Sequence, residues 1–266
     1  MEKSAILSIQ LLGDFSLVYG DVPLRTVSTA RLKSLLAYLL LHRNVPLSRH
    51  QLAFLFWPDS SEAQAHNNLR QSIHRLRHAL PDVECFLDCD VHTIQWRPGS
   101  SFVLDVAEFE KAVDAASSID SLREAVTLYQ GDLLRDCYDD WILIERERLQ
   151  QKFHTILEHL IHSLEELGDY RSAIHFAERL LRDDPLKEET YQELIRLNAV
   201  SGNRTGAMRA YHTCARVLKH ELDVEPGLET RIVFEDSQKT RGLPVFVDLP
   251  QKRKNNLQPF STPIYV

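Results

Sequence analysis

The stretch EAQAHNNLRQSIHRLRHAL, residues 62–80, decides the fold of the first part of this chain. Leu69, Ile73, Leu76 and Leu80 follow one another at helical spacing, which places all four on one side of an α-helix. The other side is polar and carries almost no acid. We therefore expect an amphipathic helix that buries an apolar stripe and presents amide, imidazole and guanidinium groups to solvent.

The composition of this polar side indicates DNA binding. Asn, Gln and Arg side chains present donors and acceptors that match base edges in the major groove, and Arg also neutralises phosphates. The side consists of Gln64, Asn67, Gln71, His74, Arg75 and His78, with Arg70 and Arg77 on its flank. A plain surface helix is the alternative, because polar outer faces are the rule in globular proteins.

Two further amphipathic segments precede this helix. Residues 48–57 begin at Ser48, a preferred N-cap, and end before Pro58. Only the turn of residues 59–61 separates them from residues 62–80, which is the spacing of a helix-turn-helix. Residues 29–43 predict one more helix, with leucines directed inward, and make a three-helix core possible. Residues 85–96 then predict two short strands, joined by a two-residue turn at Cys89-Asp90 or Asp90-Val91, which would form a wing.

The second half of the chain contains a repeat. The segment GDYRSAI at residues 168–174 recurs as GNRTGAM at residues 202–208, an offset of 34 residues. This is the period of a tetratricopeptide (TPR) repeat, in which the glycine lies at the turn between paired helices. Pro185 ends the first unit, since proline cannot continue a helix. We expect an all-α, TPR-like domain.

Several segments together resemble the SARP and AfsR-like bacterial transcriptional regulators. These are the N-terminal strands of residues 7–17, the leucine-rich run of residues 31–40, the LFWPD corner of residues 55–59, and LRQSIHRLR at residues 69–77. The resemblance implies a DNA-binding domain of the OmpR type, with a small sheet ahead of a winged helix-turn-helix. Residues 108–109, 138–141 and 217–227 are similar to the bacterial transcriptional activation domain (BTAD) that follows it in that family.

The predicted DNA contacts follow from the position of each side chain. Asn67, Gln71 and His74 point outward from the middle of the helix and are candidates for base edges. Arg70 is similar to a position that lies at the DNA surface in the OmpR-type family, so it would contact a base or a phosphate. Arg75, Arg77, Ser48 and Arg49 would hold phosphates, the last two at a helix start where free N–H groups favour an anion. Gln64 and Asn68 complete the predicted DNA-binding set. An ion pair is the alternative for Arg77, and a solvated turn is the favoured alternative to minor-groove contact for His92 and Thr93.

The net charge of −7 is divided unevenly along the chain. Residues 1–104 contain 10 Lys and Arg against 9 Asp and Glu, whereas residues 105–266 contain 21 against 29. Only the first half is suited to face phosphates, and its weak positive charge predicts salt-sensitive binding. A homodimer on two half-sites would compensate for weak individual contacts. The acidic second half is suited to a protein partner or to self-association, and the family resemblance implies RNA polymerase or its sigma factor as a partner.

Other classes of function find little support in the sequence. There is no GxxxxGK loop, GxSxG elbow or HExxH motif, so we expect no enzyme and no cofactor. His154, Glu158 and His162 share a helical face, but no fourth ligand converges on them, so we expect no metal. Four cysteines without CxxC spacing predict reduced thiols. No apolar run is long enough to span a membrane, and no signal pattern is seen, which predicts a cytoplasmic protein.

The sequence thus predicts a mainly α protein with a small β component. We expect a winged helix-turn-helix at residues 1–104, a TPR-like activation domain at residues 105–242, and a linker or tail at residues 243–266. The tail ends a compact regulator or leads into a longer one with a nucleotide-binding domain. The expected function is sequence-specific DNA binding at repeated half-sites near a promoter, as an activator. The alternative is a protein-interaction scaffold that uses the TPR-like domain without binding DNA by itself.

Overall fold

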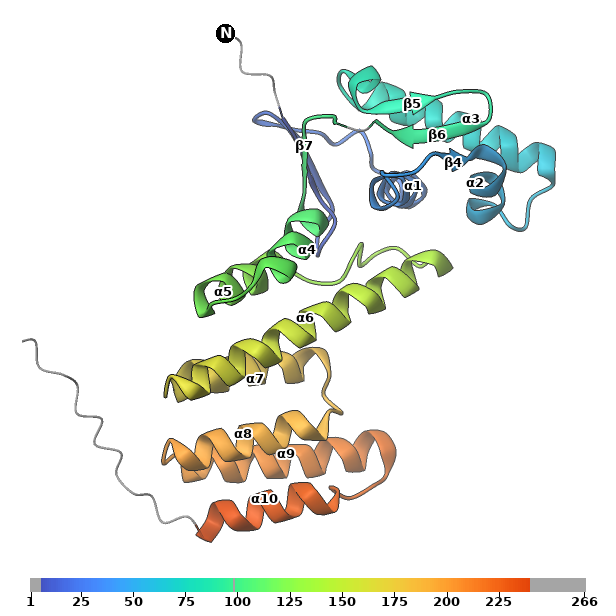
Figure 1. The fold of residues 1–266 in the computed structure, drawn as a ribbon. Helices are drawn as coiled ribbons and strands as arrows, with labels where there is room; N and C mark the ends of the chain where they lie inside the picture. Colours follow the sequence, from blue (N-terminus) through green and yellow to red (C-terminus); the bar gives the residue numbers. More distant parts are fainter. Residues whose placement is uncertain (1–5, 98, 240–266) are drawn as a thin grey trace, which may run out of the picture. The chain divides into compact units, whose positions relative to one another are not determined.

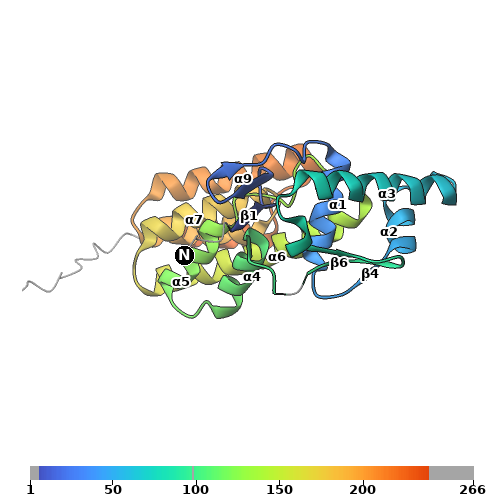
Figure 2. The same ribbon diagram turned by 90° about the horizontal axis from the view of Figure 1, so that it is seen from above.

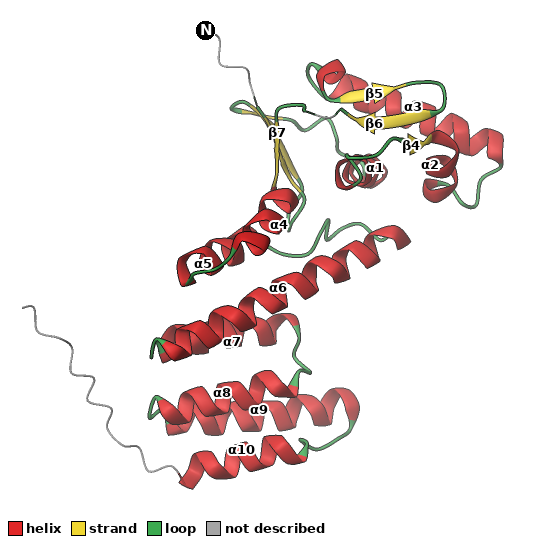
Figure 3. Ribbon diagram, in the orientation of Figure 1, coloured by secondary structure: helices red, strands yellow, loops and turns green. Residues whose placement is uncertain are grey.

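The computed structural model of the chain describes residues 6–97 and 99–239 (Figure 1). The predicted linker or tail at residues 243–266 lies outside these residues. Ten α-helices and seven short strands lie in the described part, which confirms the mainly α fold with a small β component. Figure 3 shows how strongly helix predominates over strand. They form two compact units, within Met1–Thr190 and within Tyr191–Val266. In the part of the chain described, no helix has the length and apolar character needed to cross a membrane.

Three helices form the core of the N-terminal region, as the sequence predicts. They are α1 (Ala30–Leu41), α2 (Arg49–Phe56) and α3 (Glu62–Ala79). Each begins where a hydroxyl side chain accepts a backbone N–H of the first turn, from Thr29, Ser48 and Ser61 respectively. Figures 1 and 2 show the three helices grouped together. The helix-turn-helix is therefore confirmed.

Two small sheets flank these helices. The first has the order β3-β2-β1-β7, from β1 (Leu7–Gln10), β2 (Ser16–Tyr19), β3 (Val22–Pro23) and β7 (Phe102–Leu104). In it β1 pairs antiparallel with β2 and parallel with β7, so that Leu7 lies opposite Phe102. The second sheet has the order β4-β6-β5, from β4 (Leu47–Ser48), β5 (Leu87–Cys89) and β6 (Thr93–Trp96). The short 3₁₀ helix η1 (Val83–Cys85) connects α3 to β5.

The helices of the second half occur in turn-linked pairs. In the first unit α4 (Asp105–Ala115) is followed by α5 (Ile119–Leu128), and α6 (Asp140–Glu166) by α7 (Tyr170–Asp183). In the second unit lie α9 (Arg204–Leu222), α10 (Leu228–Lys239) and most of α8 (Glu188–Val200).

The two segments offset by 34 residues have the same local geometry. Gly168 and Gly202 both have φ of +79°, a left-handed conformation that glycine adopts without steric cost. The next residue caps the following helix in both cases: Asp169 accepts from the Ser172 N–H, and Asn203 accepts from the Gly206 N–H. The alanines at the fifth position after each glycine are buried. The assignment of these units as TPR repeats stays a prediction.

The loop between α5 and α6 is bonded to the end of the first sheet. Leu12 and Leu133 form an antiparallel bridge, and the Leu134 N–H donates to the Leu11 carbonyl at 2.9 Å. The Arg146 guanidinium donates to the carbonyls of Leu133, Leu134 and Cys137 at 2.8–3.1 Å, which fixes this loop from the side of α6. The small sheet is therefore extended by a segment that lies more than a hundred residues further along the chain.

Asp105, the first residue of α4, binds the same end of the first sheet through its side chain. Its Oδ2 accepts the backbone N–H groups of Leu11 and Leu12 at 2.8 and 2.7 Å, and its Oδ1 accepts that of Val106 at 2.8 Å. Burial raises the pKa of this carboxyl, whereas the three N–H groups act in the opposite direction. One carboxylate thus accepts the two backbone N–H groups that directly follow β1.

We expect Asp105→Ala to lower the free energy of unfolding by about 2 kcal/mol or more, because each buried N–H left without an acceptor costs about 1–3 kcal/mol. Urea denaturation measures the change. Glu108→Ala, at an exposed position one turn further along α4, is the matched control and should change stability little. Equal effects of the two substitutions would contradict the role assigned to Asp105.

Candidate nucleic-acid interface

The helix α3 has one buried and one exposed side, as expected from its sequence. Ala65, Leu69, Ile73 and Leu76 are buried, and each is at most 4% exposed. Gln71, His74 and Arg75 lie exposed on the opposite side. Because the buried stripe faces the core formed with α1 and α2, the rotation of α3 about its own axis is fixed. The polar side chains therefore face solvent together.

The candidate base-reading residues differ in their exposure to solvent and in their side-chain partners. Gln71 and His74 are exposed, and the His74 ring stacks on that of His78 at 4.2 Å between centroids. Asn67 is only half-buried. The Gln64 side chain is exposed but donates to Asn68 Oδ1 at 2.9 Å, so these two amides are joined in a pair one helical turn apart.

The three arginines of α3 have different surroundings. Arg70 and Arg75 are exposed, and within residues 6–97 and 99–239 neither forms an ion pair. Arg77 forms an ion pair with Glu84, a residue of η1, and this contact raises the pKa of the guanidinium. The ion pair was the alternative considered for Arg77, and the structure contains it. Arg70 and Arg75 are the cations of α3 that are available to a phosphate without breaking such a pair.

Ser48 and Arg49 join the start of α2 to the wing. The Ser48 Oγ accepts the Gln51 N–H at 3.4 Å, and the Ser48 backbone pairs with Thr93 across β4 and β6. The Arg49 N–H donates to the His92 carbonyl at 2.9 Å, and its guanidinium donates to the Asp90 carbonyl at 3.2 Å. Both side chains thus have structural partners at this helix start.

The wing is a hairpin of β5 and β6, but its turn lies further along the chain than predicted. Cys89 pairs with Ile94 and the Asp90 N–H donates to the Thr93 carbonyl at 3.1 Å, so the two residues of the turn are Val91 and His92, and the predicted positions at Cys89-Asp90 or Asp90-Val91 are wrong. Asp90 organises this turn. Its Oδ1 accepts the N–H groups of His92 and Thr93 at 2.6 Å, and its Oδ2 accepts the Thr93 hydroxyl at 2.8 Å. An aspartate that bonds the backbone two and three residues later is a common way to form such a turn.

The rear of the helix-turn-helix contacts the start of α6, a contact that the sequence did not reveal. The Trp141 indole N–H donates to the Ser34 hydroxyl at 3.2 Å, and its ring meets that of Tyr38 edge-on at 5.0 Å. Asp139 forms an ion pair with Arg31 at 2.9 Å and also accepts a hydrogen bond from Ser34. Asp139 lies at the N-cap of α6 but makes no side-chain cap bond, because its carboxylate is directed to α1.

The histidines considered for a metal site on α6 do not form one. His154 is buried, Glu158 forms an ion pair with Lys187, and His162 lies 3.3 Å from Glu166. These side chains share the predicted helical spacing, but Glu158 and His162 form different ion pairs, and the His154 Nε2 is buried without a hydrogen-bond partner among the described residues. None of the four cysteines forms a disulfide within the described residues, and Cys137 and Cys214 are buried.

Two family models match the chain, in the order in which the two regions occur. The model described as transcriptional regulatory protein, C terminal, matches residues 25–95, which contain α1, α2, α3 and the wing. The model described as bacterial transcriptional activator domain matches residues 103–236.

Two known proteins resemble the chain. Regulatory protein AfsR of Streptomyces coelicolor is 24% identical over 250 residues, which cover 88% of this chain but 25% of AfsR. The chain therefore spans about a quarter of that relative. The structure of Mycobacterium tuberculosis EmbR in complex with a low-affinity phosphopeptide has the same fold, with a TM-score of 0.68 at 21% identity over 90% of this chain and 66% of that one.

A winged helix with an exposed polar helix, joined to a helical domain with these matches, defines a DNA-binding transcriptional regulator. The chain belongs to the bacterial transcriptional activator domain family, whose model matches half of its length, and the expected SARP and AfsR-like resemblance is confirmed. Its relatives are regulators rather than enzymes.

We expect the wing to depend on the ionised Asp90 carboxylate. Hydrogen bonds from the Thr93 N–H, the Thr93 hydroxyl and the His92 N–H hold its pKa below the usual value. The stabilisation is therefore complete above the pKa of the unfolded chain and is lost as pH falls through the lower, folded value. An NMR titration should show the His92 and Thr93 amide shifts changing with a midpoint below 3.8, the ordinary value for aspartate.

Asp90→Ala should accelerate amide hydrogen exchange in the turn at neutral pH, because it removes all three acceptor bonds. Asp88→Ala, at an exposed position on β5, is the control and should leave the turn unchanged. Unchanged exchange in Asp90→Ala would show that the strands alone determine the turn.

Proposed function

We propose that the chain is a sequence-specific transcription activator that inserts α3 into the major groove of DNA. One observation carries the proposal: α3 buries its apolar stripe and turns amides, imidazoles and unpaired guanidinium groups outward along one side. A helix-turn-helix holds its second helix in this way so that side chains reach base edges. The wing, which is bonded to the start of α2, would lie against the DNA backbone beside the groove.

The roles proposed for individual residues follow this placement. Gln71 and His74 are the leading base readers, because both are exposed in the middle of α3, and Asn67 would join them. Arg70 would contact a base or a phosphate, and Arg75 a phosphate. The remaining predicted residues would contact DNA only after their present hydrogen bonds or ion pairs rearrange. They are Ser48, Arg49, Gln64, Asn68 and Arg77.

The helical domain is proposed to set the assembly on DNA. Two copies would place their α3 helices on half-sites about 10 to 11 base pairs apart, or a multiple of that spacing. Residues 105–242 would form this domain and residues 1–104 the DNA-binding domain. The excess of acid in the second half disfavours contact with DNA and suits a protein surface, for which we propose RNA polymerase or its sigma factor. These contacts would take place in the cytoplasm, where bacterial DNA lies.

Selection from a random duplex library with the purified chain tests the proposal directly. Enrichment of a repeated motif, bound more tightly than its scrambled version in an anisotropy titration, would support it, and the spacing of the repeat would report the dimer. No enrichment at low salt would overturn it in favour of the protein-interaction scaffold.

We expect the double variant Asn67→Ala, Gln71→Ala to lose the preference for the selected sequence over the scrambled one. A good contact to a base edge contributes about 1–3 kcal/mol of discrimination, so the ratio of the two affinities should fall by about tenfold or more. Gln151→Ala, an exposed glutamine on α6, is the matched control. A preserved preference in the double variant would refute base reading by these amides.

Arg75→Ala should weaken binding to both sequences about equally, because a phosphate contact carries no sequence information. The slope of log K against log salt should become less negative by about 1. Arg209→Ala, at an exposed position of α9, should leave the slope unchanged. A selective loss of affinity for one sequence would instead assign Arg75 to a base.

A further inference from the structure

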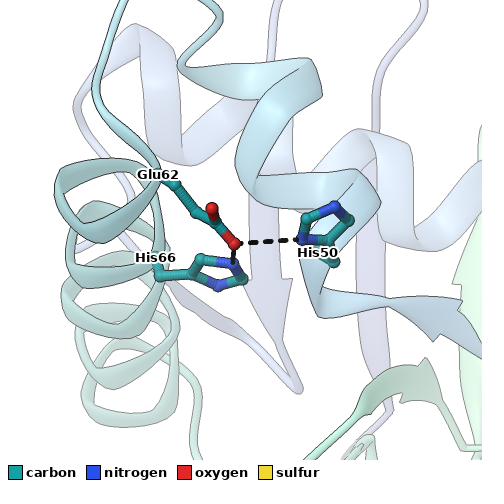
Figure 4. A group of neighbouring side chains, drawn as sticks. All are labelled: His50, Glu62 and His66. Carbon is teal, nitrogen blue, oxygen red and sulfur yellow. Dashed lines mark ion pairs between the residues drawn. The ribbon is translucent and has the colours of Figure 1, made fainter.

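Three side chains from two helices converge beside the turn of the helix-turn-helix. His50 lies in the first turn of α2, whereas Glu62 and His66 lie in the first two turns of α3 (Figure 4). The His50 Nδ1 is 3.9 Å from the Glu62 Oε1, and the His66 Nε2 is 4.0 Å from that same oxygen. One nitrogen or oxygen from each residue lies within 4.8 Å of the other two.

This donor set suits a transition metal better than the hard cations of biology. Imidazole nitrogen binds zinc, copper, iron and nickel, whereas magnesium and calcium select oxygen ligands. Two histidines and one glutamate are a known ligand set of zinc sites that keep a fourth position open. Zinc bonds of about 2.0–2.2 Å in a tetrahedron place neighbouring donors about 3.4 Å apart. The observed spacings exceed this by a small amount that side-chain rotation can close.

The backbone holds the three residues in a fixed arrangement. Glu62 and His66 are separated by four residues on α3 and therefore lie on the same helical face. Leu52 and Ala53 of α2 and Ala65 and Leu69 of α3 are buried, so the two helices are fixed by the core beneath the cluster. The exposed side chains of His50 and Glu62 can rotate without disturbing that core. Metal binding would thus cost little reorganisation.

The cluster contains one more potential metal ligand than a simple ion pair, which has two charged groups. A single carboxylate lies between two imidazoles, whose ring centroids are 5.6 Å apart. Elsewhere on the chain, His162 and Glu166 form the same helical pair without a second imidazole. The sequence pattern did not reveal the cluster because His50 comes from a different helix, twelve residues before Glu62.

We propose that His50, Glu62 and His66 form a binding site for a divalent transition-metal ion, zinc in particular, with a fourth position open to water. The ion would connect the start of α3 to the start of α2 across the intervening turn. It would stabilise the helix-turn-helix, since a ligand that binds only the folded state shifts unfolding in its favour. It would also bring a dication to the helix that we propose reads DNA.

Isothermal titration of the full chain with zinc chloride, after removal of metal with a chelator, tests the site. We expect one ion per chain, and a loss of affinity of at least about tenfold in His50→Ala and in His66→Ala, since each removes one of three ligands. His162→Ala is the matched control and should bind zinc as the unaltered chain does. No saturable binding, or equal losses in His50→Ala and His162→Ala, would overturn the proposal.

A second variant separates this site from the thiols. Cys85 is exposed and Cys89 half-buried, and thiolates also bind zinc. Cys85→Ser should retain the binding, and loss of the ion in this variant but not in His50→Ala would overturn the assignment. Cobalt substitution gives an independent readout: its visible absorption should change in His66→Ala and stay the same in Cys85→Ser.

Thermal unfolding tests the site even in a variant that is less stable, because the Tm of each variant is compared with and without zinc. Zinc should raise the Tm of the unaltered chain and of His162→Ala, and should not raise that of His50→Ala, which circular dichroism must first show to be folded. The outcome is independent of the proposed function. Saturable zinc binding by a chain that selects no DNA sequence would leave the metal site intact and overturn only the DNA-binding proposal.

Discussion

The burial of one stripe of α3 is the constraint on which the rest of the N-terminal region depends. Leu69, Ile73 and Leu76 each gain about 1.5–3 kcal/mol when they leave water, and they can do so together only at one rotation of the helix. That rotation determines which polar groups face outward. It also brings His66 toward α2 and Arg77 toward η1, so the candidate interface, the metal cluster and the ion pair with Glu84 share one cause.

Local patterns predicted the helices well because each has a signal of its own. The serine caps of α2 and α3 and the spacing of their apolar residues determine where they begin and which side they bury. The two glycine turns are equally local, since a positive φ followed by a capping side chain requires only adjacent residues. The outward direction of Gln71, His74 and Arg75 follows from the same periodicity, so this part of the candidate site was predictable.

Contacts between distant residues were not predictable from such patterns. Asp139 directly precedes a helix, where a side-chain cap is common, yet Arg31 and Ser34 of α1 bind its carboxylate. The strand β4 pairs with β6 through only two residues, which are too few to show an alternation of polar and apolar side chains. The partners of Arg77 and of Ser48 lie in segments whose position relative to α3 and α2 depends on the tertiary fold. Sequence spacing predicts which face a side chain occupies, but not what lies opposite.

Trp141 completes the packing behind the helix-turn-helix from outside residues 1–104. Its indole covers the Ser34 hydroxyl and the edge of the Tyr38 ring, and it belongs to a helix of 27 residues, about 40 Å long. A fragment cut at residue 104 would lose this cover along with Asp105 and would present its rear to water. The start of this helix is bound to α1 at the rear of the helix-turn-helix, and its last turns lie about 40 Å further on. One continuous helix therefore belongs both to the packing behind α1 and to the helical pair that it forms with α7.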